Sequence, residues 1–414
     1  MNYVAALVMN IVIACSGIGI SLLVTRDPRF QLPHVYALLA FMFALAAAGS
    51  VFGSIFLARW SDRIGRRPMI LLSLSGFLVT AGLLGVVGSW AQLFVVVIVQ
   101  ACCLGTFWPS LEARITDGAD GRQMARRLGT WGIAISIGLL PGPVIGGTLS
   151  DLWIRAPFYG AALLGGLLLA VLAVAFRGEK LHDGHRFNGA ASSEEDPLLL
   201  APSTRRAFLI SAWVANGALC AAASILRGIF PRFASLPETR GGLGMSGFEA
   251  GLILAAISLS MLPVFVILGR YPFWHYRLRY LLMGQGAAIA GCLFFALCSS
   301  LPMLATGALL YGVGGGVTYF SSIYYSLHAH TERGTQSGLH EAVMGGGFIS
   351  GMLITATFMW YSQSHRTPYW ICIGIVLAGI TAQIVVVARA RDEARLEAAT
   401  PINGRHRLRK VEET

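Results

Sequence analysis

The sequence predicts an all-α membrane protein in which twelve transmembrane helices form two six-helix bundles related by pseudo-symmetry. Three observations support this. Of 414 residues, 55% are hydrophobic and only 12% are charged, whereas a soluble domain carries roughly 25% charged residues. The mean hydropathy is +0.66. The apolar residues gather in about twelve runs long enough to cross a bilayer as helices, and a polar stretch divides these runs into two sets of six.

Each run is long enough to cross the hydrocarbon layer, which needs about 20 apolar residues. Residues 177–206 are rich in Asp, Glu, Ser, His and Gly, so they are expected to form a cytoplasmic linker. The expected organisation is an N-terminal bundle (1–176), the linker, a C-terminal bundle (207–388) and a cytoplasmic tail (389–414). The expected spans are 3–24, 35–58, 69–89, 91–111, 128–150, 157–176, 207–230, 248–268, 280–300, 302–325, 338–361 and 367–388.

The net charge is +11, and its distribution indicates topology. If the N-terminus is cytoplasmic, most of the 31 Lys and Arg residues lie on the inner side, as the positive-inside rule requires. We therefore expect a multi-pass protein of the cell (bacterial inner) membrane with both termini in the cytoplasm and the lipid bilayer as its surroundings. The basic residues stand in short segments between apolar runs, which argues against a nucleic-acid partner. Residues 1–14 contain no Lys or Arg, so residues 3–24 are read as a retained span and not as a signal peptide.

The link between spans two and three carries a distinctive motif. Residues 58–68 read A-R-W-S-D-R-I-G-R-R-P. Gly65 permits the positive φ of a tight turn between helices. Asp62 is suited to accept hydrogen bonds from a helix N-terminus or to pair with an arginine. The alternative is a plain basic turn that only fixes topology.

Span five contains the second motif, G-L-L-P-G-P-V-I-G-G, at residues 138–147. Glycines four residues apart share one helix face and allow another backbone to approach closely in lipid, while Pro143 removes a hydrogen-bond donor and bends the helix. The alternative is a general packing face of small residues. The motif residues are Gly138, Gly142, Pro143, Gly146 and Gly147.

The loop motif resembles the cytoplasmic signature of the major facilitator superfamily, G-x-L-a-D-R-x-G-R-R, although Ala58 replaces its first glycine and Trp60 its leucine. The resemblance implies two six-helix bundles around a central cavity, moving by rocking-type alternating access. It also implies that this loop acts as a conformational latch, and that the span-five motif is of the kind typical of exporters and antiporters. The latch residues would be Asp62, Arg63, Gly65, Arg66 and Arg67.

The two halves also show signs of a repeat. When the first half is shifted by 209 residues, four glycines coincide with glycines of the second half. A duplicated six-helix unit is typical of a secondary transporter whose site lies between the halves. The coinciding pairs are Gly105 with Gly314, Gly129 with Gly338, Gly138 with Gly347, and Gly142 with Gly351.

Ionisable residues inside the spans are few and therefore informative. Glu112 ends span four, and His340 and Glu341 open span eleven. We expect these three to act in protonation or gating, with H+ as a candidate coupling ion; the alternative is solvation at the cytoplasmic face. Adjacent residues on a helix point about 100° apart, so His340 and Glu341 do not face one site directly. Arg227 is a candidate partner for an anion or a side chain that snorkels outward.

By resemblance, spans one, four, seven and ten line the path, and their polar or aromatic residues suit a neutral or amphipathic organic molecule. For each residue, an interhelical packing contact is the alternative. The sequence has no nucleotide loop, zinc-type H-E-x-x-H or nucleophile elbow, so no enzyme, cofactor or metal is expected. The candidate cavity residues are Asn10, Gln100, Trp108, Asn216, Tyr311 and Tyr319.

The expected function is therefore secondary active transport of a small organic solute by a monomer, as efflux driven by an ion gradient. Two alternatives stay open. One is uptake of a sugar or another nutrient, and the other is a non-transporting membrane sensor on the same scaffold.

Overall fold

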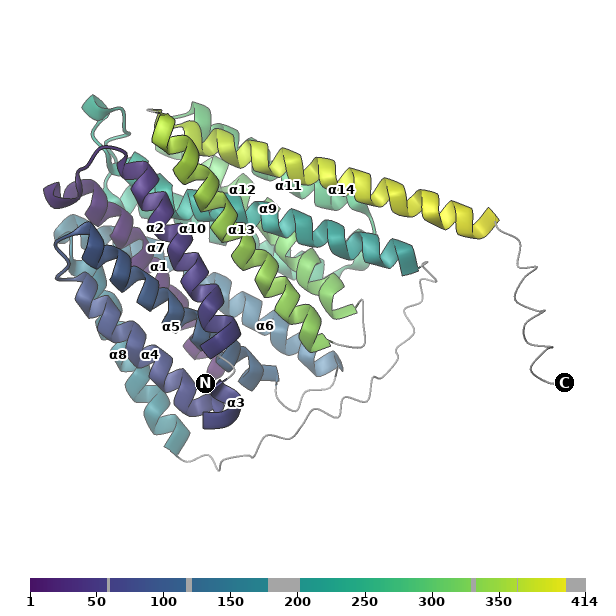
Figure 1. The fold of residues 1–414 in the computed structure, drawn as a ribbon, viewed down its shortest axis with the longest axis horizontal. Helices are drawn as coiled ribbons and strands as arrows, with labels where there is room; N and C mark the ends of the chain where they lie inside the picture. Colours follow the sequence, from purple (N-terminus) through teal and green to yellow (C-terminus); the bar gives the residue numbers. More distant parts are fainter. Residues whose placement is uncertain (58–59, 117–120, 178–201, 329–332, 363, 400–414) are drawn as a thin grey trace.

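The computed structural model describes residues 1–57, 60–116, 121–177, 202–328, 333–362 and 364–399 (Figure 1). Within these ranges, twelve helical segments are long and apolar enough to cross a membrane. Helices are the expected form because lipid offers backbone N–H and C=O groups no hydrogen-bond partner, so each span must satisfy its own. The predicted all-α class and the number of spans are confirmed.

The first eight α-helices form what we call the N half. A π-helical turn, Gly53–Leu57, extends α2. The helices are α1 (Asn2–Arg26), α2 (Val35–Phe52), α3 (Ser61–Ile64), α4 (Arg66–Leu84), α5 (Trp90–Thr116), α6 (Gly121–Leu139), α7 (Pro141–Leu152) and α8 (Ala156–Arg177).

The remaining six helices form the C half. They are α9 (Pro202–Ser235), α10 (Gly247–Arg270), α11 (Leu278–Leu297), α12 (Leu301–His328), α13 (Arg333–Tyr361) and α14 (Thr367–Ala399).

Two features differ from the expected spans. The span expected at 128–150 is divided into α6 and α7 at Leu140. Pro141 and Pro143 both lack the N–H that would bond back to the preceding turn. The interruption falls just before Pro141, whereas Pro143, where the sequence predicted the bend, lies in the first turn of α7. Helices α9 and α14 also run past the expected spans, to Pro202 and Ala399, into the regions expected to be linker and tail. Residues 178–201 and 400–414 of those regions lie outside the described residues.

The two halves lie side by side, with the N half at the lower left and the C half at the upper right of Figure 1. Helix α2 packs on α13, α7 on α10, and α1 on α9. We call the end that carries the α1–α2, α7–α8 and α9–α10 connections the distal end. The largest apolar cluster crosses between the halves, since it includes Leu39 and Leu226.

Glycines set the spacing of equivalent helix pairs in both halves. Gly138 and Gly142 lie against the backbone of α1 at Leu7 and Ile11. The equivalent contacts in the C half are those of Gly347 and Gly351 with the backbone of α9 at Gly217 and Ala221. The α6/α7 span therefore packs on α1 as α13 packs on α9, which supports two of the glycine pairs found in the sequence.

One pair in the proposed repeat is wrong. Gly105 meets Ser50 of α2, and the glycine that makes the equivalent contact with Ser260 of α10 is Gly312. Gly314 instead faces α11 at Gly284. The alignment fails here because several glycines follow one another in this helix, and the sequence does not say which one faces which neighbour.

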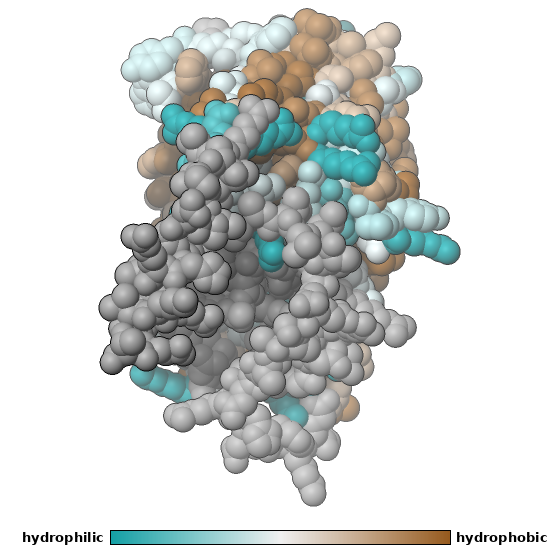
Figure 2. All heavy atoms as spheres, turned by 90° about the vertical axis from the view of Figure 1, so that its right-hand side faces the viewer, coloured by the Kyte–Doolittle hydropathy of each residue, from teal (hydrophilic) through white to brown (hydrophobic). Residues whose placement is uncertain are grey.

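The flanks of the molecule are apolar, whereas hydrophilic side chains gather on the end face shown in Figure 2. On α8, Leu163, Leu167 and Val171 are exposed at four-residue intervals and form one face of the helix. In a water-soluble protein an exposed apolar stripe of this kind would promote aggregation, whereas in a bilayer it contacts lipid.

The glycine contacts generate the first prediction. A Cβ at Gly142 would lie 2.6 Å from Ala14 Cβ and 2.8 Å from Ile11 O. We expect Gly142→Ala to lower the melting temperature by several degrees, because overpacking costs about 1–3 kcal/mol. Gly166→Ala is the matched control, since no heavy atom lies within 4 Å of its added methyl. Thermal unfolding in detergent checks this, and equal melting temperatures for the two variants would contradict it.

Candidate functional site at the interface of the two halves

The predicted signature loop is partly described. Gly65 has a φ of +99°, the conformation expected for a turn between α3 and α4. Arg63 is exposed, and Arg66 and Arg67 are half-buried. Asp62 lies in α3, but its side chain is outside the described residues. The latch role of this loop therefore stays a prediction.

The span-five motif presents two faces to different neighbours. Gly138, Gly142 and Gly146 face α1, within the N half. Gly147 faces the other way and meets the backbone of Gly247 on α10, in the C half. The carbonyl of Pro143 meets Gly251 on the same helix. The motif thus packs its own half and brings the two halves into backbone contact.

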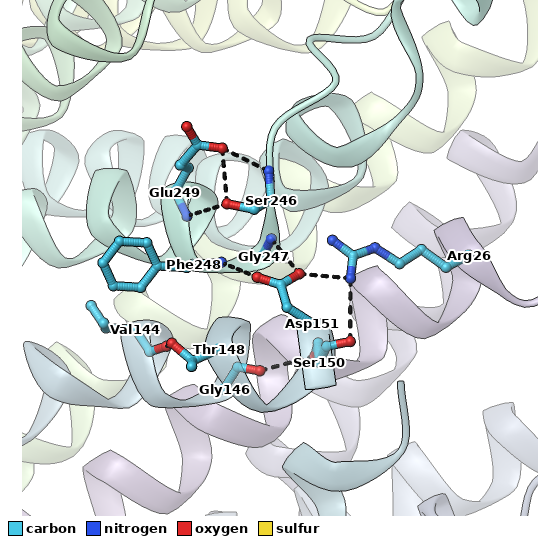
Figure 3. A network of polar contacts seen from close by, with 10 residues as sticks. All are labelled: Arg26, Val144, Gly146, Thr148, Ser150, Asp151, Ser246, Gly247, Phe248 and Glu249. Atoms are coloured by element: carbon cyan, nitrogen blue, oxygen red, sulfur yellow. Dashed lines mark hydrogen bonds and ion pairs between the residues drawn. The ribbon is translucent and has the colours of Figure 1, made fainter. Parts of the chain in front are cut away.

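Next to this contact, one carboxylate joins three helices (Figure 3). Asp151 Oδ1 accepts hydrogen bonds from the backbone N–H of Gly247 and from Arg26, each at 2.8 Å. Its Oδ2 accepts from the backbone N–H of Phe248, also at 2.8 Å. The N–H groups of the first turn of α10 have no partners inside their own helix, and the positive end of the helix dipole favours a carboxylate there. Asp151 therefore caps a helix of the opposite half.

Helix α10 also has a cap of its own. Ser246 Oγ accepts from the backbone N–H of Glu249, and Glu249 Oε2 accepts from the backbone N–H of Ser246 at 2.8 Å. This capping box is readable in the sequence as S-x-x-E before an apolar run. The box satisfies the N–H groups of Ser246 and Glu249, and Asp151 accepts from the two N–H groups between them, those of Gly247 and Phe248.

Further contacts join the halves at the distal end. Ser21 on α1 donates to the carbonyl of Gly228 on α9 at 2.7 Å. The ring of His34 stacks on Trp360 with centroids 4.4 Å apart, and the ring of Tyr36 lies 5.1 Å from that of His365. The distal end is thus closed by apolar, polar and aromatic contacts together.

Arg232, on α9, is buried at this closed end. It is 6% exposed, and its guanidinium lies over the ring of Tyr36, 4.9 Å from the centroid. It donates to the carbonyl of Val24 at 3.3 Å. Its Nε has no hydrogen-bond partner among the described residues, and the Tyr36 hydroxyl makes no well-formed hydrogen bond there beyond its approach to this guanidinium. A charge buried with so few partners is costly.

Two carboxylates from different halves stand near those ends of their spans that lie opposite the distal end. Glu112 on α5 and Glu341 on α13 lie within electrostatic reach of each other, and both reach Tyr319 on α12. Glu112 is half-buried, and Glu341 is exposed. The structure therefore places two of the three residues predicted for protonation within electrostatic reach of each other, one from each half.

His340, the third residue, faces elsewhere. It is 1% exposed, its Nδ1 is 2.8 Å from Ser322 Oγ, and its ring meets the ring of Tyr319 edge-on at 5.4 Å. Its Nε2 has no hydrogen-bond partner in the described part of the chain. The separation from Glu341 agrees with the 100° between helical neighbours.

Most of the candidate cavity residues are buried in this conformation. Asn10 donates to the carbonyl of Ala6, and Tyr311 to that of Leu219. These contacts favour the packing alternative for both residues. Gln100 and Asn216 are also buried, each with an amide nitrogen that has no partner among the described residues. Trp108 and Tyr319 are half-buried, so they keep some surface for a solute.

Several functional candidates were not found from the sequence. Asp151, Arg26 and Arg232 look like ordinary charged residues near span ends, where solvation is the usual explanation. Arg227 is half-buried and lies within electrostatic reach of Tyr311 and Cys220, so it does not snorkel outward. Within the described residues, no group of His, Cys, Asp and Glu has the geometry to hold a metal ion.

Twelve candidate spans in two glycine-packed halves, with polar groups between the halves, define a polytopic helical membrane protein. The family model described as Major Facilitator Superfamily matches residues 4–345. The chain belongs to this superfamily, as the resemblance of its motifs predicted.

Several named proteins are similar in sequence to this chain. Multidrug resistance protein 1 of Bacillus subtilis (strain 168) is 32% identical over 41% of this chain and 43% of the relative. Tetracycline resistance protein, class C, of Escherichia coli is 34% identical over 37% of this chain and 35% of the relative. The chain thus covers less than half the length of these two relatives. Quinolone resistance protein NorA of Staphylococcus aureus (strain MRSA252) is 22% identical over 94% of this chain and 97% of the relative.

Solved structures share the fold. The nucleoside transporter NupG superposes with a TM-score of 0.64 at 13% identity, covering 93% of this chain and 98% of the other. A bacterial homologue of the human lysosomal transporter Spinster, in an inward-facing and occupied conformation, gives a TM-score of 0.62 at 15% identity, covering 97% and 96%. At these identities the likeness concerns the fold alone.

The connection between α1 and α2 is tied to the connection between α7 and α8 through Asp27. Its carboxylate accepts from Arg29 Nη2 at 2.6 Å and from Arg155 Nη2 at 3.2 Å. Arg155 also donates to the carbonyls of Gly85 and Val87. The hydrogen bond from Arg29 is the main reason why the pKa of Asp27 lies below its ordinary value of 3.8.

This gives the second prediction. A carboxyl whose pKa is lowered in the folded protein adds stability above its ordinary pKa and loses that contribution as the pH falls through the lowered value. We expect Asp27→Asn to lower the melting temperature at pH 7, and the gap to the wild type to narrow below about pH 4. Melting curves of both proteins from pH 7 to pH 3 check this. Glu238→Gln, on an exposed turn, is the control, and a gap that is constant with pH would contradict the assignment.

Proposed function

We propose that this protein is a secondary active transporter that exports a small organic solute by alternating access, driven by an ion gradient. The names of its relatives support export, since they are multidrug, tetracycline and quinolone resistance proteins. The observation that supports the mechanism is that Glu112 and Glu341, one from each half, lie within electrostatic reach of each other.

The two carboxylates supply a physical reason for coupling. Like charges that approach each other destabilise a closed state unless one of them binds a proton or a cation. Any movement that brings the two halves together around Glu112 and Glu341 therefore favours protonation or a positively charged solute there. We propose H+ as the coupling ion, bound at this pair. His340 would hold the adjacent face of α13 against α12.

The same proposal includes the orientation. The excess of Lys and Arg in the loops opposite the distal end favours cytoplasmic termini, with the distal end facing outward. The described conformation is then closed to the outside. We propose that the protein works as a monomer in the bacterial inner membrane, and that Asp62, Arg63, Gly65, Arg66 and Arg67 act as a latch on the cytoplasmic side. The two bundles and the 177–206 linker form the moving parts.

Export is tested in inverted membrane vesicles. We expect vesicles containing the protein to accumulate labelled tetracycline or norfloxacin when a proton gradient is imposed, and to lose the accumulated label when a protonophore is added. Vesicles without the protein are the control. Accumulation in intact cells but not in inverted vesicles would instead indicate uptake. Failure of every labelled solute to move, with folded protein in the membrane, would favour the sensor alternative.

The role of the carboxylate pair gives a separate prediction. Glu341→Gln removes the charge while keeping the side-chain size, so we expect the dependence of transport on the pH gradient to fall at least tenfold. Glu238→Gln is the matched control, because it removes a carboxylate on the distal η4 turn (Glu238–Arg240), outside the candidate spans. Counterflow, which needs no gradient, should survive in Glu341→Gln. An unchanged pH dependence would exclude Glu341 from coupling.

A further inference from the structure

We propose that the distal closure is held by one set of contacts and opposed by another, so that it is poised to open. The holding contact, which we call the Asp151 latch, consists of Arg26, Asp151 and the backbone N–H groups of Gly247 and Phe248. The opposing contact is the buried pair Arg232 and Tyr36. The proposal rests on the proposed function, because it assigns these residues to one step of the transport cycle.

The Asp151 latch favours closure through charge-assisted hydrogen bonds. One carboxylate accepts from two backbone N–H groups and one guanidinium, all at 2.8 Å. Its partners come from α1 in the N half and from α10 in the C half. Hydrogen bonds to an ionised group are stronger than neutral ones, and the helix N-terminus adds its positive potential. Separation of the halves removes α10 from the carboxylate and leaves Arg26 with it.

The Asp151 latch acts on the interface between the halves and not on the formation of α10. The capping box of Ser246 and Glu249 fixes the start of this helix from within, whatever happens to Asp151. The N–H groups of Gly247 and Phe248 would reach water if the halves parted. Loss of Asp151 should therefore change the balance between closed and open distal ends while leaving the helix intact.

Arg232 and Tyr36 have the opposite effect. The guanidinium has five N–H donors, and its hydrogen bond to the carbonyl of Val24 is long, at 3.3 Å. Within the described residues it has no salt bridge, and the positive charge of Arg240 is within electrostatic reach. The Tyr36 hydroxyl is buried as well, and among the described residues it makes no well-formed hydrogen bond beyond its approach to this guanidinium. Opening the distal end lets water reach both groups and removes the cost of their desolvation.

The two contacts lie on the same interface, so substitutions in them should move one equilibrium in opposite directions. Removing the charge of Asp151 should favour the open distal end. Removing the guanidinium of Arg232 or the hydroxyl of Tyr36 should favour the closed one. A purely structural role would predict the same sign for all three, because each variant would only weaken packing.

The test measures the separation of the halves at the distal end directly. Spin labels are placed at Val86→Cys, between α4 and α5, and at Leu297→Cys, at the end of α11; both side chains are 65% exposed. The background lacks the seven native cysteines. Double electron–electron resonance in liposomes then gives the populations of short and long distances in the full chain, without any substrate.

We expect Asp151→Asn to raise the long-distance population at least threefold. Adding Arg232→Met to Asp151→Asn should lower that population again by at least twofold, and adding Tyr36→Phe should lower it by less. Tyr36→Phe removes one atom, so it serves as the second variant if Arg232→Met does not fold. Glu249→Ala removes only the local capping box of α10, so its distances should equal those of the spin-labelled protein without further substitutions.

Two results would overturn the proposal. One is a distance distribution for Asp151→Asn that equals that of the spin-labelled protein without this substitution. The other is a longer population when Arg232→Met or Tyr36→Phe is added. Failure of the proposed function is seen separately, as absence of solute movement in vesicles, and it leaves the distance changes intact. Normal transport with unchanged distances would reject the latch and keep the function.

Discussion

Close approach of helix backbones at glycines fixes the spacing of the helices in this protein, and its polar contacts follow from that spacing. An apolar side chain gains little free energy when it moves from lipid to a helix interface, so helices associate through shape complementarity, dispersion and hydrogen bonds. Gly142 on α7 and Gly351 on α13 bring their helices against α1 and α9 in the same way. Gly147 does this between the halves, where it meets Gly247. The positions of the polar groups at the interface follow from these contacts.

At the distal end, the contact between Gly147 and Gly247 places the carboxylate of Asp151 within hydrogen-bonding distance of α10. Asp151 stands one turn beyond Gly147 on α7, so close packing at the glycine carries the carboxylate to the start of α10. Arg26 arrives from α1, which the other glycines of the same motif hold in place. One sequence motif therefore supports both the apolar contact and the ionic contact that lies beside it.

Few charged side chains lie inside the described part of the protein, and three of them lie where the two halves face each other. Glu112 and Glu341 come from opposite halves, and Arg232 of the C half covers Tyr36 of the N half. A buried charge is tolerated only where it is paired, hydrated or functional. Groups at a moving interface exchange burial for hydration during the movement, which makes both end states accessible to a modest driving force.

The sequence by itself determined the membrane class, the number of spans, the family and the glycine face of span five, because hydropathy and residue spacing are local properties of the chain. The tertiary structure decided which glycine of α12 meets α10, where Gly312 takes the place expected for Gly314. It also decided that Asp151 caps a helix 96 residues away and that Tyr311 is buried against α9. These contacts depend on the rotation and depth of each helix relative to its neighbours, and a hydrophobic pattern repeated along every helix leaves both undetermined.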